Sequence, residues 1–192
     1  MKFPAIYLAS GSPRRRELLT QIGVDFSVLS VEVDESRFDN ESPVDYVQRV
    51  ALAKAQAGFQ SLNQQHKMPV LGADTSVVLG DDVLGKPIDD QDAKTMLQQL
   101  SGRSHQVLTA VALVTEKGNL VVLNTSVVTF ATLTDADIDW YLSTKEGTDK
   151  AGSYAVQGIA ALFIEQIQGS YTGIMGLPVR ETGLLLQQIY NV

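Results

Sequence analysis

The apolar positions of the chain recur with two periods, and together they predict strands that alternate with helices. Apolar runs that alternate with polar residues, or that are uninterrupted, are typical of strands, whereas apolar residues at positions i, i+3, i+4 and i+7 are typical of helices. The predicted strands are a short one beginning at Ile6 and residues 26–33, 69–73, 75–79, 83–84, 106–115, 120–133, 153–156 and 162–167. The predicted helices are residues 13–22, 42–58, 90–100, 134–142 and 179–190.

This order of elements predicts an α/β fold in which helices flank a mixed sheet. A purely parallel sheet is not expected, because two hairpins interrupt the alternation, one around Gly80 and a long one around the turn at residues 116–119. The apolar run 69–73 should be a buried strand that delivers Asp74 at its C-terminal end, which is where α/β proteins place their chemistry.

Length and composition narrow the class of protein. A chain of 192 residues suits one domain, in one or two lobes, and we expect a single domain over residues 1–192. The 44% apolar content is ordinary for a soluble protein, and no window approaches the ~20 apolar residues that span a bilayer. No signal peptide is recognisable, so a cytoplasmic protein without a membrane partner is expected. The net charge of −7 argues against a nucleic-acid partner, which requires a basic face.

The inventory of metal ligands is equally restrictive. The chain has no cysteine, which excludes disulfides and thiolate zinc sites, and its only histidines are His66 and His105. Any metal should therefore be a hard cation held by carboxylates.

The segment from Ile6 to Ile22 combines ordinary helix signals with one conflict. Ser12 is suited to cap the helix, Pro13 to occupy its first position and Gly23 to end it. Residues 14–16 are all arginine, although the helix dipole repels cations in the first turn by roughly 0.3–1 kcal/mol each. A bound phosphate would remove the conflict, since helix N-termini and arginines both bind phosphate oxygens. The alternative is that the arginines are solvated surface.

Other charged residues lie beside predicted strands and helices. Glu35 follows strand 26–33, as Asp74 follows strand 69–73, and Lys86 follows the first hairpin. Lys54 falls on the apolar stripe of helix 42–58, either as a snorkelling side chain or as part of a site. Carboxylates and cations without cysteine or histidine ligands fit Mg²⁺-assisted chemistry on a phosphate ester.

The chain lacks the sequence motifs of three common enzyme classes. There is no G-x-x-x-x-G-K-[ST] loop of P-loop proteins and no strand-linked G-x-G-x-x-G of dinucleotide-binding folds. Ser153 and Ser170 lack the G-x-S-x-G context of serine hydrolases, and His105 is expected to begin a strand.

Short motifs are spread over nearly the whole chain. They are Leu8-Ala9-Ser10-Gly11-Ser12-Pro13-Arg14-Arg15, Val33-Asp34-Glu35, Gly72-Ala73-Asp74-Thr75, Gly85-Lys86-Pro87, residues 149–158 (DKAGSYAVQG) and Gly176-Leu177-Pro178. Together they closely resemble the Maf family of nucleoside triphosphate pyrophosphatases, in the branch that acts on dTTP and UTP.

The resemblance implies a fold and a reaction. The fold would be like that of inosine triphosphate pyrophosphatases, an elongated mixed sheet between two helical lobes with the active cleft between them. The reaction would be cleavage between the α- and β-phosphates, dependent on a divalent metal cation (Mg²⁺ or Mn²⁺), releasing a nucleoside monophosphate and pyrophosphate. The binding partner would be a nucleoside triphosphate substrate. Whether the protein forms a homodimer is left open at this point.

The resemblance also implies roles for individual residues. Asp74 would be the catalytic base or the acid that orients the metal, with Glu35 as its partner and both as metal ligands. Phosphates would be contacted by Ser10, Arg15, Lys54 and Lys86, the last also counted as catalytic. Base specificity would be set by Arg14, Thr75 and Gln157. The Gln157 amide could accept from N3–H of uracil or thymine while donating to a neighbouring carbonyl.

Two alternatives stay open at this point. A non-catalytic nucleotide-binding regulator of cell division would have no need for Asp74, Glu35 and a metal. A pyrophosphatase of the 7-methyl-GTP type would carry Trp, Gln and Glu in place of Arg14, Thr75 and Gln157, because a cationic base favours an aromatic face and a carboxylate. The choice between canonical and modified pyrimidine nucleotides is also open.

Overall fold

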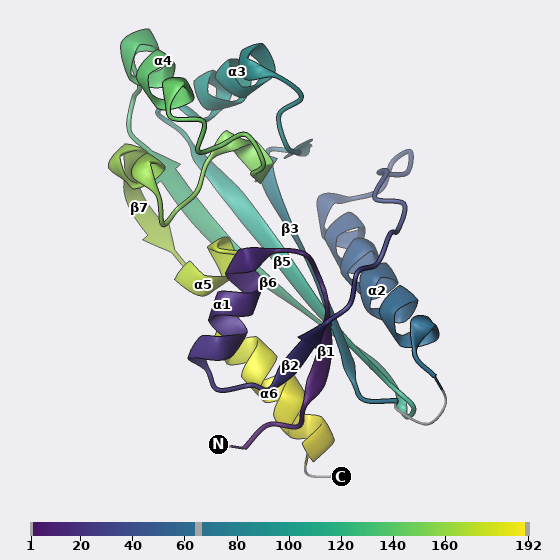
Figure 1. Cartoon of the computed structure of the whole chain (residues 1–192). Helices are drawn as coiled ribbons and strands as arrows, with labels where there is room; N and C mark the ends of the chain where they lie inside the picture. The colour runs from purple at the N-terminus through teal and green to yellow at the C-terminus, as the bar shows by residue number, and fades with distance from the viewer. Residues whose placement is uncertain (1, 64–66, 191–192) are drawn as a thin grey trace.

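The computed structural model describes residues 2–63 and 67–190, and its centre is one mixed sheet with helices on both faces (Figure 1). The strand order is β2-β1-β3-β5-β6-β7, with β4 paired to β3. The strands are β1 (Ile6–Ala9), β2 (Phe26–Val28), β3 (Val70–Leu79), β4 (Asp82–Leu84), β5 (Ser104–Thr115), β6 (Gly118–Phe130) and β7 (Ile164–Gln168). β1 runs parallel to β2 and β3, and the other pairs are antiparallel, so the predicted mixed sheet is confirmed.

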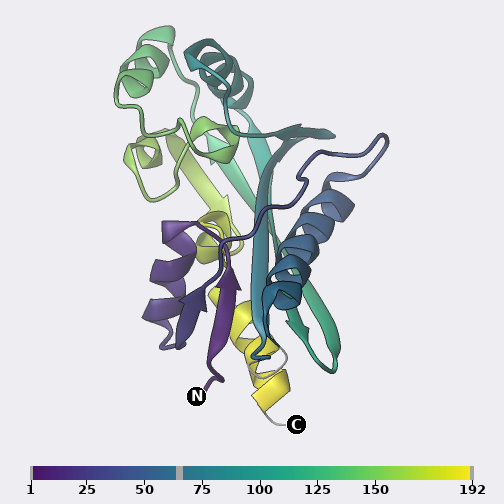
Figure 2. The same cartoon turned by 45° about the vertical axis from the view of Figure 1, so that its right-hand side comes forward.

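Most of the helices gather toward the two ends of the long β5–β6 hairpin, and one short helix lies against its middle (Figures 1 and 2). The helices are α1 (Pro13–Gln21), α2 (Pro43–Ser61), α3 (Asp90–Leu100), α4 (Asp135–Ser143), α5 (Tyr171–Ile174) and α6 (Val179–Tyr190), with 3₁₀ helices η2 (Ala151–Ser153) and η3 (Ile159–Phe163). At one end α2 covers one face of the sheet while α1 and α6 cover the other. At the other end α3 and α4 pack around an aromatic core.

Residues at the helix ends confirm most of the predicted starts. The Ser42 side chain accepts from the Asp45 amide at the start of α2, and Thr134 and Asp137 form the reciprocal capping box of α4. Ser12 differs, because it holds the N-cap position of α1 without a side-chain capping bond. Gly23 follows the end of α1 at φ +71°, a left-handed conformation that glycine adopts without strain.

Gly72 sets how closely α2 lies on the sheet. A Cβ atom at this position would come within 2.5 Å of the Ala51 carbonyl oxygen and 2.6 Å of the Ala55 amide nitrogen, both on α2. Small residues therefore allow the helix backbone to rest directly on β3. Because Lys54 and Asp74 lie on these two elements, this contact also determines how far apart they are.

Several predicted strands are wrong in extent. β2 ends at Val28 rather than 33, because β1 ends at Ala9 and leaves the following residues no strand to pair with after the bond from the Leu29 amide to the Leu8 carbonyl. Glu35 therefore lies on an irregular segment and not at the end of a strand.

Asp74 is also placed differently from the prediction. It lies inside β3 and not after its end, because β5 pairs with β3 without interruption from Val70 to Val78. Residues 69–73 and 75–79 are thus one strand.

The predicted strand 153–156 does not form. The chain there turns through η2, with Gly152 and Ser153 at positive φ, which no strand accommodates. Strand 162–167 is shifted to Ile164–Gln168 behind η3, and α5 was not predicted. His66 lies outside the described residues. None of the described helices is long and apolar enough to cross a membrane.

Candidate active site

Most of the predicted site residues meet where one edge of β3 has no strand partner. They are Ser10, Arg15, Glu35, Lys54, Asp74 and Thr75. β3 pairs with β1 as far as Gly72 and with β4 from Val77 onward, so among the described strands none pairs with residues 73–76 on that edge. We call residues 73–76 the edge gap. Side chains along a strand point alternately to opposite faces of the sheet. The Asp74 side chain therefore contacts Lys54 of α2 on one face, and the Thr75 side chain contacts Arg15 of α1 on the other. The gap lets two helices contribute to one site.

Arg15 is buried in this site and held by neutral acceptors. Its Nε donates to the Gly176 carbonyl at 2.8 Å, and its terminal nitrogens donate to Ser10 Oγ at 3.0 Å and Thr75 Oγ1 at 3.2 Å. A guanidinium has five N–H donors, so two are left uncommitted by these bonds. Among the described residues no carboxylate lies within ion-pair distance of Arg15. A buried guanidinium without a counter-charge is costly, and a bound anion would offset that cost.

The hydroxyl groups beside Arg15 have a fixed proton order. Thr109 Oγ1 donates its only proton to the Gly173 carbonyl at 2.8 Å. The 3.0 Å contact between Thr75 and Thr109 must therefore use the proton of Thr75, while Thr75 accepts from Arg15. Thr75 consequently has an acceptor lone pair but no proton left for a ligand.

On the other side of the gap, Lys54 joins the two predicted carboxylates. Its Nζ lies 2.9 Å from Asp74 Oδ1 and 3.0 Å from Glu35 Oε1. The Asp74 side chain is 11% exposed and that of Glu35 is 53% exposed, so one acid is enclosed and the other faces solvent. The Lys54 ammonium thus pairs with two carboxylates and does not extend into solvent as a snorkelling lysine would.

The electrostatics of the two buried groups follow from desolvation. Burial raises the pKa of Asp74, although Lys54 and Arg15 both act to lower it. Burial likewise lowers the pKa of Arg15, against the opposing charges of Asp74 and Glu35. An acid with a raised pKa is suited to proton transfer near neutral pH, since it is a stronger base than an ordinary carboxylate.

Arg14 and Gln157 are brought together from distant parts of the chain. With its amide oxygen facing Arg14, Gln157 accepts from Nε at 2.6 Å and from a terminal nitrogen at 3.0 Å. Arg14 also lies 3.7 Å from Glu17. The oxygen of Gln157 is therefore occupied, and the expectation that it accepts from a base N3–H does not fit this arrangement. The amide retains its two N–H donors.

Lys86 forms no hydrogen bond or ion pair with another predicted site residue in the part of the chain that the structure describes. It is exposed on the loop after β4, and among the described residues it makes no ion pair with Asp74 or Glu35. Lys86 does act on Asp149. The pKa of Asp149 is lowered mainly by Lys150 and to a smaller extent by the charge of Lys86.

The donor set suits the predicted cation only in part. Among the described residues no three Asp, Glu, His or Cys side chains converge in a metal-binding group. Glu35 and Asp74 do converge on the Lys54 ammonium, a cation that stands between their oxygens. Mg²⁺ commonly takes one or two carboxylates and completes its shell with water and substrate phosphates. Two acids are enough for that arrangement.

Several residues that contact the predicted site residues were not singled out from the sequence. The Tyr46 hydroxyl and the Arg49 guanidinium, for example, donate to the Glu35 and Ser36 carbonyls. Thr109 lies in an apolar strand and resembles core, and Tyr46 and Arg49 flank the apolar stripe of α2 and resemble surface. Gly176 was noted in a motif without a role, although its carbonyl fixes Arg15. Only contacts between distant segments reveal these roles.

A family model described as Maf-like protein matches residues 5–189 of the sequence. The chain belongs to the Maf family. It is 52% identical over 196 residues to a protein of Aromatoleum aromaticum, covering 95% of this chain and 94% of that one. It is 49% identical over 183 residues to a protein of Hahella chejuensis, covering 95% and 91% respectively. Both relatives bear the name dTTP/UTP pyrophosphatase.

Among solved structures, this Maf chain matches the Staphylococcus aureus Ham1 protein with a TM-score of 0.47 and 17% sequence identity. The match covers 67% of this chain and 72% of that one.

Proposed function

We propose that this Maf protein is a nucleoside triphosphate pyrophosphatase that hydrolyses dTTP and UTP to the monophosphate and pyrophosphate. The main supporting observation is the buried Arg15, which has two uncommitted N–H donors and forms no ion pair among the described residues. It lies near Asp74, a carboxylate whose pKa is raised by burial. A polyphosphate would supply the missing negative charge, and Asp74 would supply the base. The relatives named dTTP/UTP pyrophosphatase support the same reading.

The reaction divides between the two sides of the edge gap. Asp74 orients the attacking water and accepts its proton, while Lys54 donates to the Asp74 carboxylate and is itself paired with Glu35. Arg15 and the Ser10 hydroxyl donate to phosphate oxygens, since Ser10 accepts from Arg15 and keeps its own proton. Lys86 would contact the leaving pyrophosphate from its exposed loop.

A divalent cation, Mg²⁺ or Mn²⁺, is part of the proposal. Glu35 and Asp74 would hold it, and it would supply Lewis-acid stabilisation of the phosphate charge. Treatment with EDTA should remove activity, and Mg²⁺ or Mn²⁺ should restore it. Full activity in EDTA would contradict this part of the proposal.

Base selection would follow from the hydrogen-bonding capacity of two side chains and the charge of a third. Gln157 offers N–H donors to a ring carbonyl, and Thr75 offers an acceptor that suits the N3–H of uracil or thymine. Cytosine has an acceptor at N3 and fits Thr75 less well. Arg14 would repel the cationic base of 7-methyl-GTP.

The direct test is to incubate the protein with dTTP, UTP, CTP or 7-methyl-GTP and Mg²⁺, and to measure pyrophosphate. The wild type should release pyrophosphate from dTTP and UTP, and the Asp74→Asn variant should not. Binding without turnover would favour the regulator, and faster cleavage of 7-methyl-GTP than of UTP would contradict the base assignment. Removal of modified pyrimidine nucleotides, a cytoplasmic location and a homodimer remain predictions.

A further inference from the structure

Glu35 has an unusual setting for a residue of an active site. It lies on the segment from residue 29 to residue 42, which contains no helix or strand, and its side chain is 53% exposed. Its carboxylate nevertheless reaches Lys54 at 3.0 Å. Something other than secondary structure or burial of the side chain must hold this segment in place.

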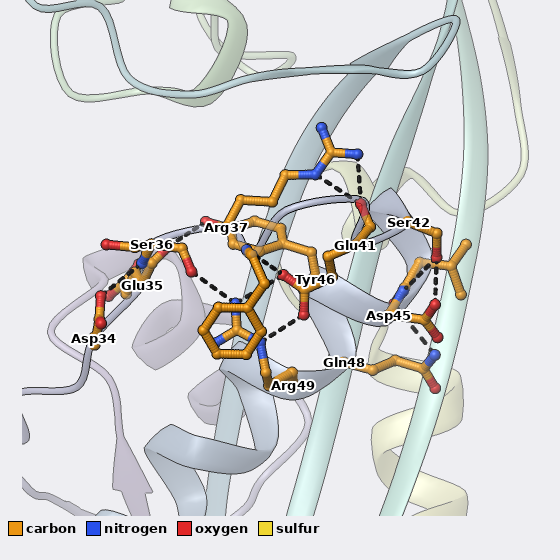
Figure 3. A network of polar contacts seen from close by, with 12 residues as sticks. Asp34, Glu35, Ser36, Arg37, Glu41, Ser42, Asp45, Tyr46, Gln48 and Arg49 are labelled. Carbon is orange, nitrogen blue, oxygen red and sulfur yellow. Dashed lines mark hydrogen bonds and ion pairs between the residues drawn. The ribbon is translucent and has the colours of Figure 1, made fainter.

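Two side chains of α2 hold the backbone of that segment at consecutive residues (Figure 3). The Tyr46 hydroxyl donates to the carbonyl oxygen of Glu35 at 2.9 Å, and the Arg49 guanidinium donates to the carbonyl oxygen of Ser36 at 2.8 Å. Both bonds are to backbone, so they position Glu35 without occupying its carboxylate. Lys54 lies on the same helix, so one rigid element fixes both ends of the contact between Glu35 and Lys54.

Arg49 is itself fixed before it reaches the segment. It forms a two-pronged ion pair with Glu41, from Nε to Oε1 at 2.6 Å and from a terminal nitrogen to Oε2 at 2.9 Å. Its guanidinium stacks on the Phe38 ring, 4.0 Å from the centroid. Glu41 Oε2 also accepts from the Phe38 amide at 3.1 Å. Planar pairing of this kind orders an arginine far more than a single contact does.

The far end of the segment is tied as well. Arg37 donates to the Glu41 carbonyl through two nitrogens, at 2.9 and 2.6 Å, and reaches the Asp81 carbonyl of the β3–β4 turn at 3.4 Å. The segment is therefore closed on itself around Glu41 and anchored to α2 on one side of that residue.

We infer that Tyr46 and Arg49 are positioning residues, which act on the reaction by setting the backbone that carries Glu35. This inference rests on the proposed function, in which Glu35 acts with Asp74. Neither residue needs to touch substrate. A displacement of Glu35 by about 1 Å can lower turnover by up to roughly 10²-fold, so loss of one of two anchors should have a smaller effect of the same kind.

The test is a double-mutant cycle of four proteins: the wild type, Tyr46→Phe, Glu35→Gln and the double variant. Tyr46→Phe removes only the hydroxyl group. Tyr46→Phe should lower kcat on UTP by roughly 3- to 30-fold with little change in KM. In the Glu35→Gln background the same change should cost less than about two-fold, because the residue through which it acts is already disabled. Arg49→Lys should behave alike, since lysine keeps the charge but cannot bridge Glu41 and Ser36.

Two controls separate positioning from general destabilisation. Gln48→Ala alters α2 at a side chain whose hydrogen bond, among the described residues, is to the Val44 carbonyl of its own helix. Ile138→Val lowers stability from the distant α4 core. Neither should change kcat at a temperature where the protein is folded. An equal loss from Tyr46→Phe with and without Glu35→Gln would overturn the inference, and so would unchanged kcat in Tyr46→Phe.

A second readout does not depend on turnover. Hydrogen–deuterium exchange of peptides covering residues 29–42 should be faster in Tyr46→Phe and Arg49→Lys, with peptides of α4 unchanged. If the wild type lacks pyrophosphatase activity, the proposed function fails but this measurement still decides whether the two side chains hold the segment. Unchanged exchange in both variants would overturn the inference on its own.

Discussion

The two halves of the site, on either side of the edge gap, are organised by different means. The half around Arg15 is enclosed, and three of its N–H donors bond to α1, β3 and the turn at Gly176, with β5 supporting Thr75. In the other half Asp74 and Lys54 are also enclosed, but Glu35 faces solvent, and side chains of α2 bond to the backbone at Glu35 and Ser36. Burial holds Arg15 in place and costs desolvation free energy, whereas Glu35 avoids most of that cost and depends on a few exposed hydrogen bonds. We expect substitutions of Arg15 to affect folding and catalysis together, and substitutions of Glu35 and the side chains that bond to its segment to affect catalysis alone.

The largest expected effect comes from the enclosed acid. Asp74→Asn keeps the shape of the side chain and removes the charge that orients water, so kcat should fall by ~10²-fold or more. Glu35→Gln should lower kcat by a similar order but leave the melting temperature within about 1 °C, because an exposed ion pair contributes little to stability. Measurement of kcat and Tm for both variants checks the contrast. A large drop in Tm for Glu35→Gln would break the comparison.

Arg15→Lys tests the enclosed half through its hydrogen bonds. A lysine cannot satisfy Ser10, Thr75 and the Gly176 carbonyl together, so buried acceptors lose their donor. We expect a loss of about 2–4 kcal/mol of unfolding free energy, a Tm lower by roughly 5–10 °C, and kcat/KM lower by ~10-fold or more. Arg16→Lys is the matched control, since Arg16 is exposed on the same turn and should change neither quantity. An Arg15→Lys protein with normal Tm would show that the contacts contribute little.

The smallest expected effect concerns the direction of the hydrogen bond between the Thr75 and Thr109 hydroxyl groups. Thr109→Val removes the acceptor to which Thr75 donates, so Thr75 gains a proton that it can offer to a ligand. The preference for UTP over CTP, as a ratio of kcat/KM values, should therefore fall by roughly 3- to 10-fold. Thr109→Ser keeps the hydroxyl and should preserve the ratio. An unchanged ratio in Thr109→Val would mean that Thr75 does not read the base.

The sequence predicted those features that depend on local signals. The bounds of α3 and the caps of α2 and α4 follow from neighbouring residues, and the structure has them as expected. Motif resemblance predicted site roles for Asp74, Glu35 and Lys54, and the structure has Lys54 within 3.0 Å of both carboxylates. Their roles in binding and catalysis stay predictions.

Features that depend on a distant partner were not predictable in this way. The length of β2 is set by where β1 ends, and the continuity of β3 through Asp74 is set by β5. The direction of the Thr75 hydroxyl depends on a carbonyl at Gly173, far along the chain. No periodicity within one segment carries that information.

The close contact at Gly72 links protein engineering to catalysis. A methyl group there would collide with the α2 backbone and push the helix outward, and Lys54, Tyr46 and Arg49 would all move with it. A change made only to fill space between helix and sheet would thus loosen the link between Asp74 and Glu35. For anyone seeking a more stable variant, the Gly72 contact should be kept fixed, and repacking is safer in the α3–α4 core, away from the edge gap.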